Sequence, residues 1–227
     1  MSKLLVEERE IVVPGQVLAE GMDYLPDQGT FRENDNIIAS NIGMVSIKGR
    51  LIKLIILNGK YIPRSGDVVI GKITNIFFNN WLVDVGYAYE ASLSLKEATS
   101  DYITRGEDLT KYFDFGENII IKVLKVDRGK NIDLTMKGPG LKKLKGGRII
   151  QVTPFKVPRV IGREGSMITT IKNATNTIIT VGQNGRIWIY SEDPINELKA
   201  EEAIMFVSEN CHKEGLTDEV KKFLEGK

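Results

Sequence analysis

One stretch of sixteen residues, 156–171, constrains the fold more than any other part of the chain. Its sequence is KVPRVIGREGSMITTI. Pro158 suits the first turn of a short apolar helix. Gly162 and Gly165 then interrupt the helical pattern, and a second helix is expected to begin at Ser166. Because glycine has no Cβ, this stretch predicts two helices joined by an open turn that a sugar-phosphate backbone can approach closely.

Neighbouring segments give these two helices a place in a larger fold. The expected elements are a strand over residues 148–152, strands over residues 177–181 and 186–190, and a last helix that begins at Asp193 and Pro194. Their order, β-α-GxxG-α-β-β-α, resembles a KH domain, whose GxxG loop binds about four nucleotides of a single strand. A turn with a purely structural role is the alternative. A second GxxG match, at residues 182–185, is interpreted as a hairpin turn between two strands.

Charge is segregated along the C-terminal part of the chain. Residues 139–190 hold nine basic residues and one acidic residue, a net charge of +8, whereas residues 191–227 carry a net charge of −5. Because the whole chain carries only +1, the basic segment indicates a polyphosphate partner and salt-sensitive binding. A solvated basic surface is the alternative. The residues predicted to contact RNA in this segment are Gly162, Arg163, Gly165, Ser166, Arg159, Lys156, Lys172 and Arg148.

Length and composition limit the class of protein. A chain of 227 residues with 42 % apolar residues can form two or three small folded domains. No stretch approaches the roughly 18 uninterrupted apolar residues of a membrane span, and the first ten residues are too charged for a secretory signal. The single cysteine, Cys211, excludes an intramolecular disulfide. These features predict a cytoplasmic protein without a membrane partner.

The sequence of residues 1–138 predicts two consecutive β domains. In residues 1–63, short apolar runs alternate with glycine- and proline-rich turns, and the run 51–57 is apolar enough to be buried on both faces. Residues 64–138 predict five strands, with a hairpin at Asn79-Asn80 and an interruption between the third and fourth strands. This pattern fits an OB-type barrel, a common binder of single strands.

Five aromatic residues fall within thirteen positions of this barrel. Either they form stacking platforms for bases, or at least half of them belong to the barrel core. Both interpretations remain open from the sequence. The five residues are Phe77, Phe78, Trp81, Tyr87 and Tyr89.

Taken together, the domains resemble the RNA-binding cap subunit of the archaeal RNA exosome. The resemblance extends over nearly the whole chain, from residue 11 to residue 211, and assigns the barrel to the type found in ribosomal protein S-one. The residues that carry it are Val13-Pro14-Gly15, Leu18, Gly21, Gly29-Thr30-Phe31, residues 59–63 and 66–71, and, in the KH domain, residues 158–162 and 165–168.

The resemblance implies a noncatalytic role without cofactor, metal or catalytic residues. It implies that three copies sit on a hexameric ring of phosphorolytic exonuclease subunits and guide the 3′ ends of single-stranded RNA into its channel for 3′-to-5′ degradation. The expected domains are a β domain over residues 1–63 that docks on the ring, an OB-fold RNA-binding domain over residues 64–138, a KH domain over residues 139–212, and a charged, solvated tail over residues 213–227. Residues 139–147 are expected to form a Gly- and Lys-rich hinge at the start of the KH domain, and the three lysines of this segment could also contact RNA.

The barrel departs from the general OB pattern at its usual stacking positions. Asn79 and Leu82 stand where two aromatics are usual, and Ser94 stands where a histidine is usual. The barrel segment also carries a net charge of −1. We therefore expect the KH domain to supply most of the affinity, and the barrel to guide RNA electrostatically rather than by stacking. The barrel residues predicted to do so are Lys122, Lys125, Arg128 and Lys130.

Two other function classes compete with the exosome subunit. The first is a transcription or translation factor, because an OB domain followed by KH domains also occurs in elongation factors, although those usually carry two KH units. The second is a nuclease, which would need clustered carboxylates or a general base. The only histidine is His212. The carboxylate pairs of the last helices are interpreted as parts of solvent-exposed helix faces. The sequence therefore predicts no enzyme activity.

Overall fold

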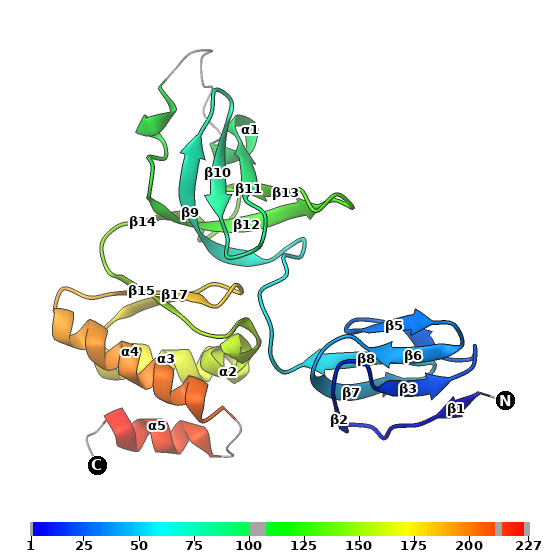
Figure 1. Cartoon of the computed structure of the whole chain (residues 1–227). Helices are drawn as coiled ribbons and strands as arrows, with labels where there is room; N and C mark the ends of the chain where they lie inside the picture. Colours follow the sequence, from blue (N-terminus) through cyan, green and yellow to red (C-terminus); the bar gives the residue numbers. More distant parts are fainter. Residues whose placement is uncertain (1, 100–107, 212–214, 225–227) are drawn as a thin grey trace. The chain divides into compact units, whose positions relative to one another are not determined.

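The computed structural model describes residues 2–99, 108–211 and 215–224 (Figure 1). The chain divides into two compact units, Met1–Gly59 and Lys60–Lys227. Within the described ranges, no helix is both long enough and apolar enough to cross a membrane.

The first unit consists of two four-stranded sheets. The strand orders are β1-β3-β6-β5 and β2-β7-β8-β4. Apolar side chains from both sheets, among them Leu18, Ile37 and Ile52, form one buried core. The strands are β1 (Lys3–Leu4), β2 (Ile11–Val12), β3 (Val17–Glu20), β4 (Leu25–Pro26), β5 (Thr30–Glu33), β6 (Asn36–Ala39), β7 (Gly43–Lys48) and β8 (Leu51–Ile56).

Strand β8 is buried on one face only, so the prediction that it is buried on both faces is wrong. Ile52 and Leu54 point into the core and are at most 2 % exposed, whereas Ile55 is 48 % exposed. The physical reason is that each sheet of a two-sheet unit has one face on the core and one face in water. The apolar run therefore leaves large side chains on the outer face of the sheet.

The second unit begins with the predicted five-stranded barrel. The strand order is β13-β11-β10-β9-β12, and pairing of β12 with β13 closes the barrel. Its core is centred on Trp81, whose indole Nε1 donates to the carbonyl oxygen of Phe113 at 3.0 Å. The elements are β9 (Val68–Ile76), β10 (Asn80–Asp84), β11 (Ala91–Ser94), α1 (Leu95–Ala98), η1 (Leu109–Lys111), β12 (Asn118–Val126) and β13 (Ile132–Thr135).

The five clustered aromatic residues have different environments. Trp81 is buried and Tyr87 packs against the core, but Phe77, Phe78 and Tyr89 are about half exposed or more. Fewer than half therefore belong to the core. Phe77 and Phe78 lie in the turn before β10 and Tyr89 lies in the turn after it, so the exposed rings occupy opposite ends of that strand. They do not form one stacking platform.

The KH domain has the predicted order of elements. Helices α2, α3 and α4 cover one face of a three-stranded sheet with order β15-β17-β16. Asp193 caps α4 by accepting from the amide of Ile195 at 2.9 Å, as its position before Pro194 predicts. The elements are β15 (Arg148–Gln151), η2 (Pro154–Lys156), α2 (Val157–Ile161), η3 (Arg163–Gly165), α3 (Ser166–Thr175), β16 (Ile178–Val181), β17 (Arg186–Tyr190), α4 (Pro194–Glu209) and α5 (Leu216–Leu224).

Helix α5 belongs to the KH core, which differs from the solvated tail expected over residues 213–227. Leu216 and Val220 are buried in the core beneath α3 and α4. The ring of Phe223 stacks on Phe206 of α4, with centroids 4.9 Å apart. Leu216, Val220 and Phe223 are spaced four and three residues apart and therefore lie on one side of the helix. The many charged residues on its other side concealed this apolar pattern in the sequence.

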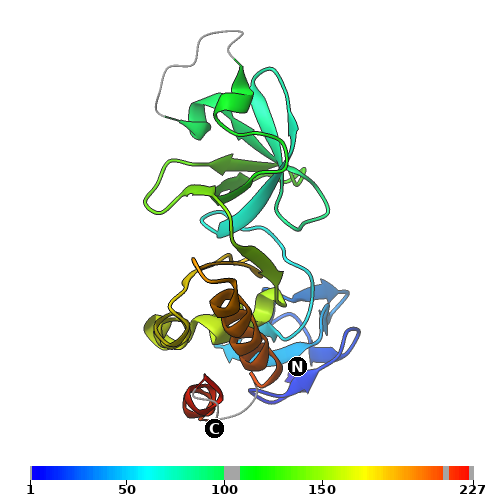
Figure 2. The ribbon, with the colours of Figure 1, turned by 90° about the vertical axis from the view of Figure 1, so that its left-hand side faces the viewer.

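The lysine-rich segment expected to be a hinge also differs from the prediction. Residues Lys142–Leu144 form strand β14, which pairs with β12 of the barrel and brings Lys142 opposite Ile120. Leu144 packs with Ile70 and Trp188 in a small core between the barrel and the KH sheet. Figures 1 and 2 show that sheet between the barrel and the helices. The barrel and the KH domain therefore share a packed interface.

The turn between β16 and β17 completes this interface. The Asn184 side chain is 1 % exposed, and its amide nitrogen donates to the carbonyl oxygens of Ile70 at 2.8 Å and Val85 at 2.9 Å. Beside it, Gln183 exchanges two hydrogen bonds with the backbone of Val68. The hairpin predicted at residues 182–185 is present, and its second role is to hold the barrel.

An ion pair lies next to this turn. Arg186 donates to the side chain of Asp84 at 2.5 Å and to its backbone carbonyl at 2.7 Å. Burial alone would raise the pKa of the Asp84 carboxyl, but the hydrogen bonds from Arg186 and from the amide of Gly86 hold that pKa below its ordinary value of 3.8.

This ion pair predicts an acid-dependent contribution to stability. Because the pKa of Asp84 is lowered in the folded protein, its contribution is present above pH 3.8 and is lost as the pH falls through the folded value. The difference in free energy of unfolding between wild type and Asp84→Asn should therefore be largest near neutral pH and should narrow below about pH 4. Urea unfolding across that range measures it. Asp133→Asn, at an exposed carboxylate of β13, is the control, and a pH-independent difference for Asp84→Asn would contradict the prediction.

A second prediction tests the place of α5 in the core. Val220→Ala removes two buried methyl groups and should lower the free energy of unfolding by about 2 kcal/mol. Lys221→Ala, at the exposed neighbouring position, should change it by less than about 0.5 kcal/mol. Equal effects of the two substitutions in urea unfolding would show that α5 does not pack as described.

Candidate nucleic-acid interface

The GxxG loop joins α2 to α3 through two glycines with different constraints. Gly162 has φ 76° and ψ 175°, and a Cβ added there would lie 2.7 Å from both the Cβ and the amide nitrogen of Met167. Gly165 has φ 78°, and a Cβ added there would meet nothing within 4 Å. Gly162 is therefore required for packing, whereas Gly165 leaves the surface of the loop open.

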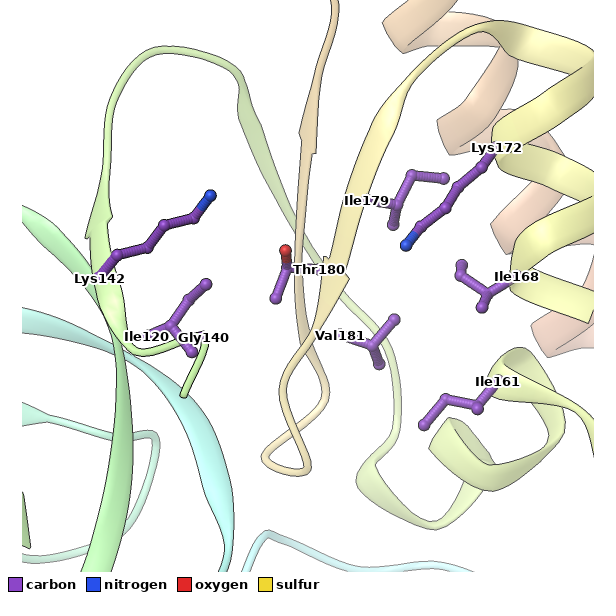
Figure 3. Close-up of a pocket in the computed structure, with 9 residues that line it drawn as sticks. All are labelled: Ile120, Gly140, Lys142, Ile161, Ile168, Lys172, Ile179, Thr180 and Val181. Atoms are coloured by element: carbon purple, nitrogen blue, oxygen red, sulfur yellow. The ribbon is translucent and has the colours of Figure 1, made fainter. Parts of the chain in front are cut away.

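A groove runs beside this loop (Figure 3). It encloses about 480 Å³, and its floor is formed by isoleucine and valine side chains of α2, α3 and β16. Ile161 and Ile168, two of these residues, flank the GxxG loop in the sequence. Among the described residues, two lysines and no acidic residue line the groove. Its lining consists of Ile120, Gly140, Lys142, Ile161, Ile168, Lys172, Ile179, Thr180 and Val181.

Five of the eight residues predicted in the KH domain lie in or beside this groove. Lys172 lines it, and the four loop residues Gly162, Arg163, Gly165 and Ser166 connect two lining residues. The other three lie elsewhere. Arg148 pairs with Glu201 of α4 at 2.7 Å, the Arg159 Nε donates to the carbonyl oxygen of Cys211 at 2.8 Å, and Lys156 is half-buried in η2.

The net charge of +8 overstates the positive charge available on this region of the surface. Arg148 pairs with Glu201, Arg186 pairs with Asp84, and Lys143 pairs with Glu117 at 2.6 Å. All three carboxylates come from outside residues 139–190, so a count along the sequence cannot include them. The positive charge of the groove itself comes from its two lining lysines.

The four basic residues predicted on the barrel form a separate group. Lys122 and Lys125 lie on β12, and Arg128 and Lys130 lie in the turn that follows it, all with exposed side chains. None of the four lines the groove. They are therefore a second candidate contact area.

Sequence reasoning did not locate the barrel side of the groove. It allowed that the lysines of the segment 139–147 could contact RNA but interpreted the segment as a hinge, because a strand of three residues in a lysine- and glycine-rich segment gives no periodic signal. The ammonium group of Lys142 lies 6.0 Å from the centroid of the Trp188 ring, within cation–π range. Ile120 lies in the strand predicted over residues 118–126, and the packing of the KH sheet on β12 places it at the groove.

Comparison with known proteins agrees with this architecture. Residues 60–106 match the family model described as RRP4, S1 domain, and residues 147–195 match that of a KH domain. The chain is 47 % identical to the exosome complex component Rrp4 of Pyrococcus abyssi, covering 99 % of this chain and 85 % of the relative. It is 44 % identical to Rrp4 of Methanothermus fervidus, covering 97 % of each.

The chain belongs to the Rrp4 family of exosome components. A crystal structure described as an exosome complex RNA-binding protein is similar to it, with a TM-score of 0.68 and 36 % identity over 74 % of this chain and 97 % of the other. The resemblance to the archaeal exosome subunit is thus confirmed. The Rrp4 matches include the N-terminal unit, which distinguishes this chain from the alternative of a transcription or translation factor.

The described residues of this Rrp4-family chain contain no group of three or more His, Cys, Asp or Glu side chains that could hold a metal ion. His212, considered above as a general base, lies outside the described residues. The groove with its GxxG loop is therefore the candidate site.

The open surface of the GxxG loop at Gly165 can be tested with two matched substitutions. Gly165→Asp should weaken binding of single-stranded RNA about tenfold or more, because a carboxylate would face the phosphates. Gly165→Asn has nearly the same shape and also tolerates a positive φ, so it should retain most of the affinity. Fluorescence anisotropy with a labelled oligonucleotide measures both. Equal losses would assign the effect to backbone strain and would argue against phosphate contact at this loop.

Proposed function

We propose that this chain is a noncatalytic RNA-binding subunit of the exosome. It caps the ring of phosphorolytic exonuclease subunits, in three copies per complex, and guides the 3′ ends of single-stranded RNA into the central channel for 3′-to-5′ degradation. It requires no cofactor and works in the cytoplasm. The observation that carries the proposal is the groove beside the GxxG loop, which combines an apolar floor with two ammonium groups.

The chemistry of the groove suits a single strand. Unpaired bases can lie against the isoleucine and valine side chains, because an unstacked base exposes an apolar face. Phosphates carry the negative charge that Lys142 and Lys172 complement, and the open loop at Gly165 lets the backbone approach. A double helix keeps its base faces stacked inside, so an apolar floor offers it little.

The first unit supports a docking role through the outer face of its second sheet. Ile11 of β2 pairs with Met44 of β7, which pairs with Ile55 of β8. Ile11 is 64 % exposed and Ile55 is 48 % exposed, and the pair Leu25 and Leu51, separated from them on this face by Lys53, is also exposed. An apolar row of this kind is typical of a surface that a protein partner covers. We assign it to the contact with the ring.

The barrel has a guiding role in this proposal. The four basic residues on β12 and its following turn, Lys122, Lys125, Arg128 and Lys130, are exposed and lie apart from the groove. Exposed positive charges attract a polyanion over a distance of about 10 Å at moderate salt without fixing its sequence. They would draw RNA along the barrel while the groove holds it.

Reconstitution tests the proposal. The purified ring with wild-type chain should bind and degrade RNA more efficiently than the ring alone, and the chain alone should degrade none. Ile55→Lys should weaken ring binding at least about tenfold, because a buried unpaired ammonium opposes association. Phe31→Lys makes the same change at an exposed position of the other sheet and should leave binding unchanged.

Three outcomes would contradict this proposal in different ways. RNA degradation by the chain alone would remove the noncatalytic role. Normal ring binding by Ile55→Lys would place the docking surface elsewhere. Failure of the wild-type chain to bind RNA would remove the function itself.

A further inference from the structure

We propose that the barrel completes the RNA groove of the KH domain. Lys142, carried by strand β14, and Lys172, carried by helix α3, hold phosphates of the same RNA strand from opposite sides. This inference rests on the proposed function and specifies how it is carried out. It joins the barrel and the KH domain into a single binding site in place of two independent modules.

The position of Lys142 follows from strand pairing. β14 adds to β12 at the edge of the barrel sheet, and Lys142 lies opposite Ile120 in that register. Cross-strand partners present their side chains on the same face of a sheet, and both residues line the groove. Figure 3 shows the ammonium groups of Lys142 and Lys172 directed toward the space between the barrel strand and α3, with Thr180 between them.

The wall that carries Lys142 is held in place. Leu144 of the same strand packs with Ile70, Ile120 and Trp188. Asn184 and Arg186 bind the barrel through hydrogen bonds that join residues more than 95 positions apart in the chain. A groove wall that is already fixed costs less ordering on binding than one that must close around the ligand.

The local environment favours Lys142 over its neighbours for this role. Lys143 is paired with Glu117, and Lys145 does not line the groove. The Lys142 ammonium has an aromatic neighbour, Trp188, and no carboxylate of the described part of the chain lines the groove beside it. An ammonium group offers donors and no acceptors, so an anion is the complementary ligand.

The size of the groove agrees with a short stretch of nucleotides. Its volume of about 480 Å³ lies within the roughly 300–1,000 Å³ of typical small-ligand sites. Bases on the apolar floor would leave their phosphates near the two lysines. Each phosphate neutralised on a single strand makes the slope of log K against log salt concentration more negative by about 0.7.

The test compares two neighbouring lysines. Lys142→Gln should weaken binding of a fluorescein-labelled ten-nucleotide single-stranded RNA about five- to tenfold and reduce the salt slope by about 0.7. Lys145→Gln removes the same charge from the same segment outside the groove and should change the affinity less than about twofold. Lys142→Arg retains the charge and should retain most of the affinity. Anisotropy titrations at several salt concentrations measure all four proteins.

The variant Lys172→Gln distinguishes a failure of this inference from a failure of the proposed function. If Lys172→Gln weakens binding while Lys142→Gln matches wild type, the KH domain binds RNA without the barrel and the inference is overturned. Equal effects of Lys142→Gln and Lys145→Gln would also overturn it, because the loss would then reflect only the general positive charge. If the wild-type chain binds no RNA, both the function and the inference fail.

A structural effect of the substitution is measured separately. Because Lys142 lies over Trp188, its loss could loosen the interface between barrel and KH sheet. Thermal unfolding and tryptophan fluorescence of Lys142→Gln should match those of Lys142→Arg. If Lys142→Gln and Lys142→Arg unfold at the same temperature but Lys142→Gln binds RNA more weakly, Lys142 contacts RNA directly. If Lys142→Gln unfolds at a lower temperature and this instability accounts for its loss of affinity, the proposed contact is overturned.

Discussion

The groove depends on one buried contact, the docking of Asn184 into the barrel. This side chain accepts a hydrogen bond from the backbone amide of Ile70 and donates to the carbonyl oxygens of Ile70 and Val85, and a buried backbone group that lacks a partner destabilises a fold. The ion pair between Arg186 and Asp84 lies beside it, and Trp188 covers the neighbouring apolar surface. Without this contact, the KH sheet would present an uncovered apolar face and the barrel would supply no wall to the groove.

This arrangement divides the basic residues into two groups with different roles. Arg148, Arg186 and Lys143 are paired with carboxylates of other segments. Lys142 and Lys172 line the groove and remain directed at its interior. We therefore expect the groove to contribute most of the affinity for a polyanion within this segment, because charges already neutralised by a carboxylate contribute little to binding.

Prediction from sequence succeeded where the signals are local. The two helices around the GxxG loop, the cap at Asp193 and the strands of the barrel follow from proline, glycine and periodicity within windows of about ten to twenty residues. It failed for β14, which is too short to show a period, and for α5, whose charges concealed an apolar side. It also failed for the outer face of β8, because burial depends on how many sheets cover a strand.

The sequence by itself determined the order of the elements, the glycines of the loop and the family to which the chain belongs, because these are properties of contiguous residues. Only the tertiary structure decided which basic residues are neutralised and which line the groove. Lys142 and Lys172 are thirty positions apart in the chain and come from different folding elements. Their common site exists because β14 joins the barrel while the hairpin at Asn184 holds the KH sheet against it, and such contacts between distant segments have no signature in the local sequence.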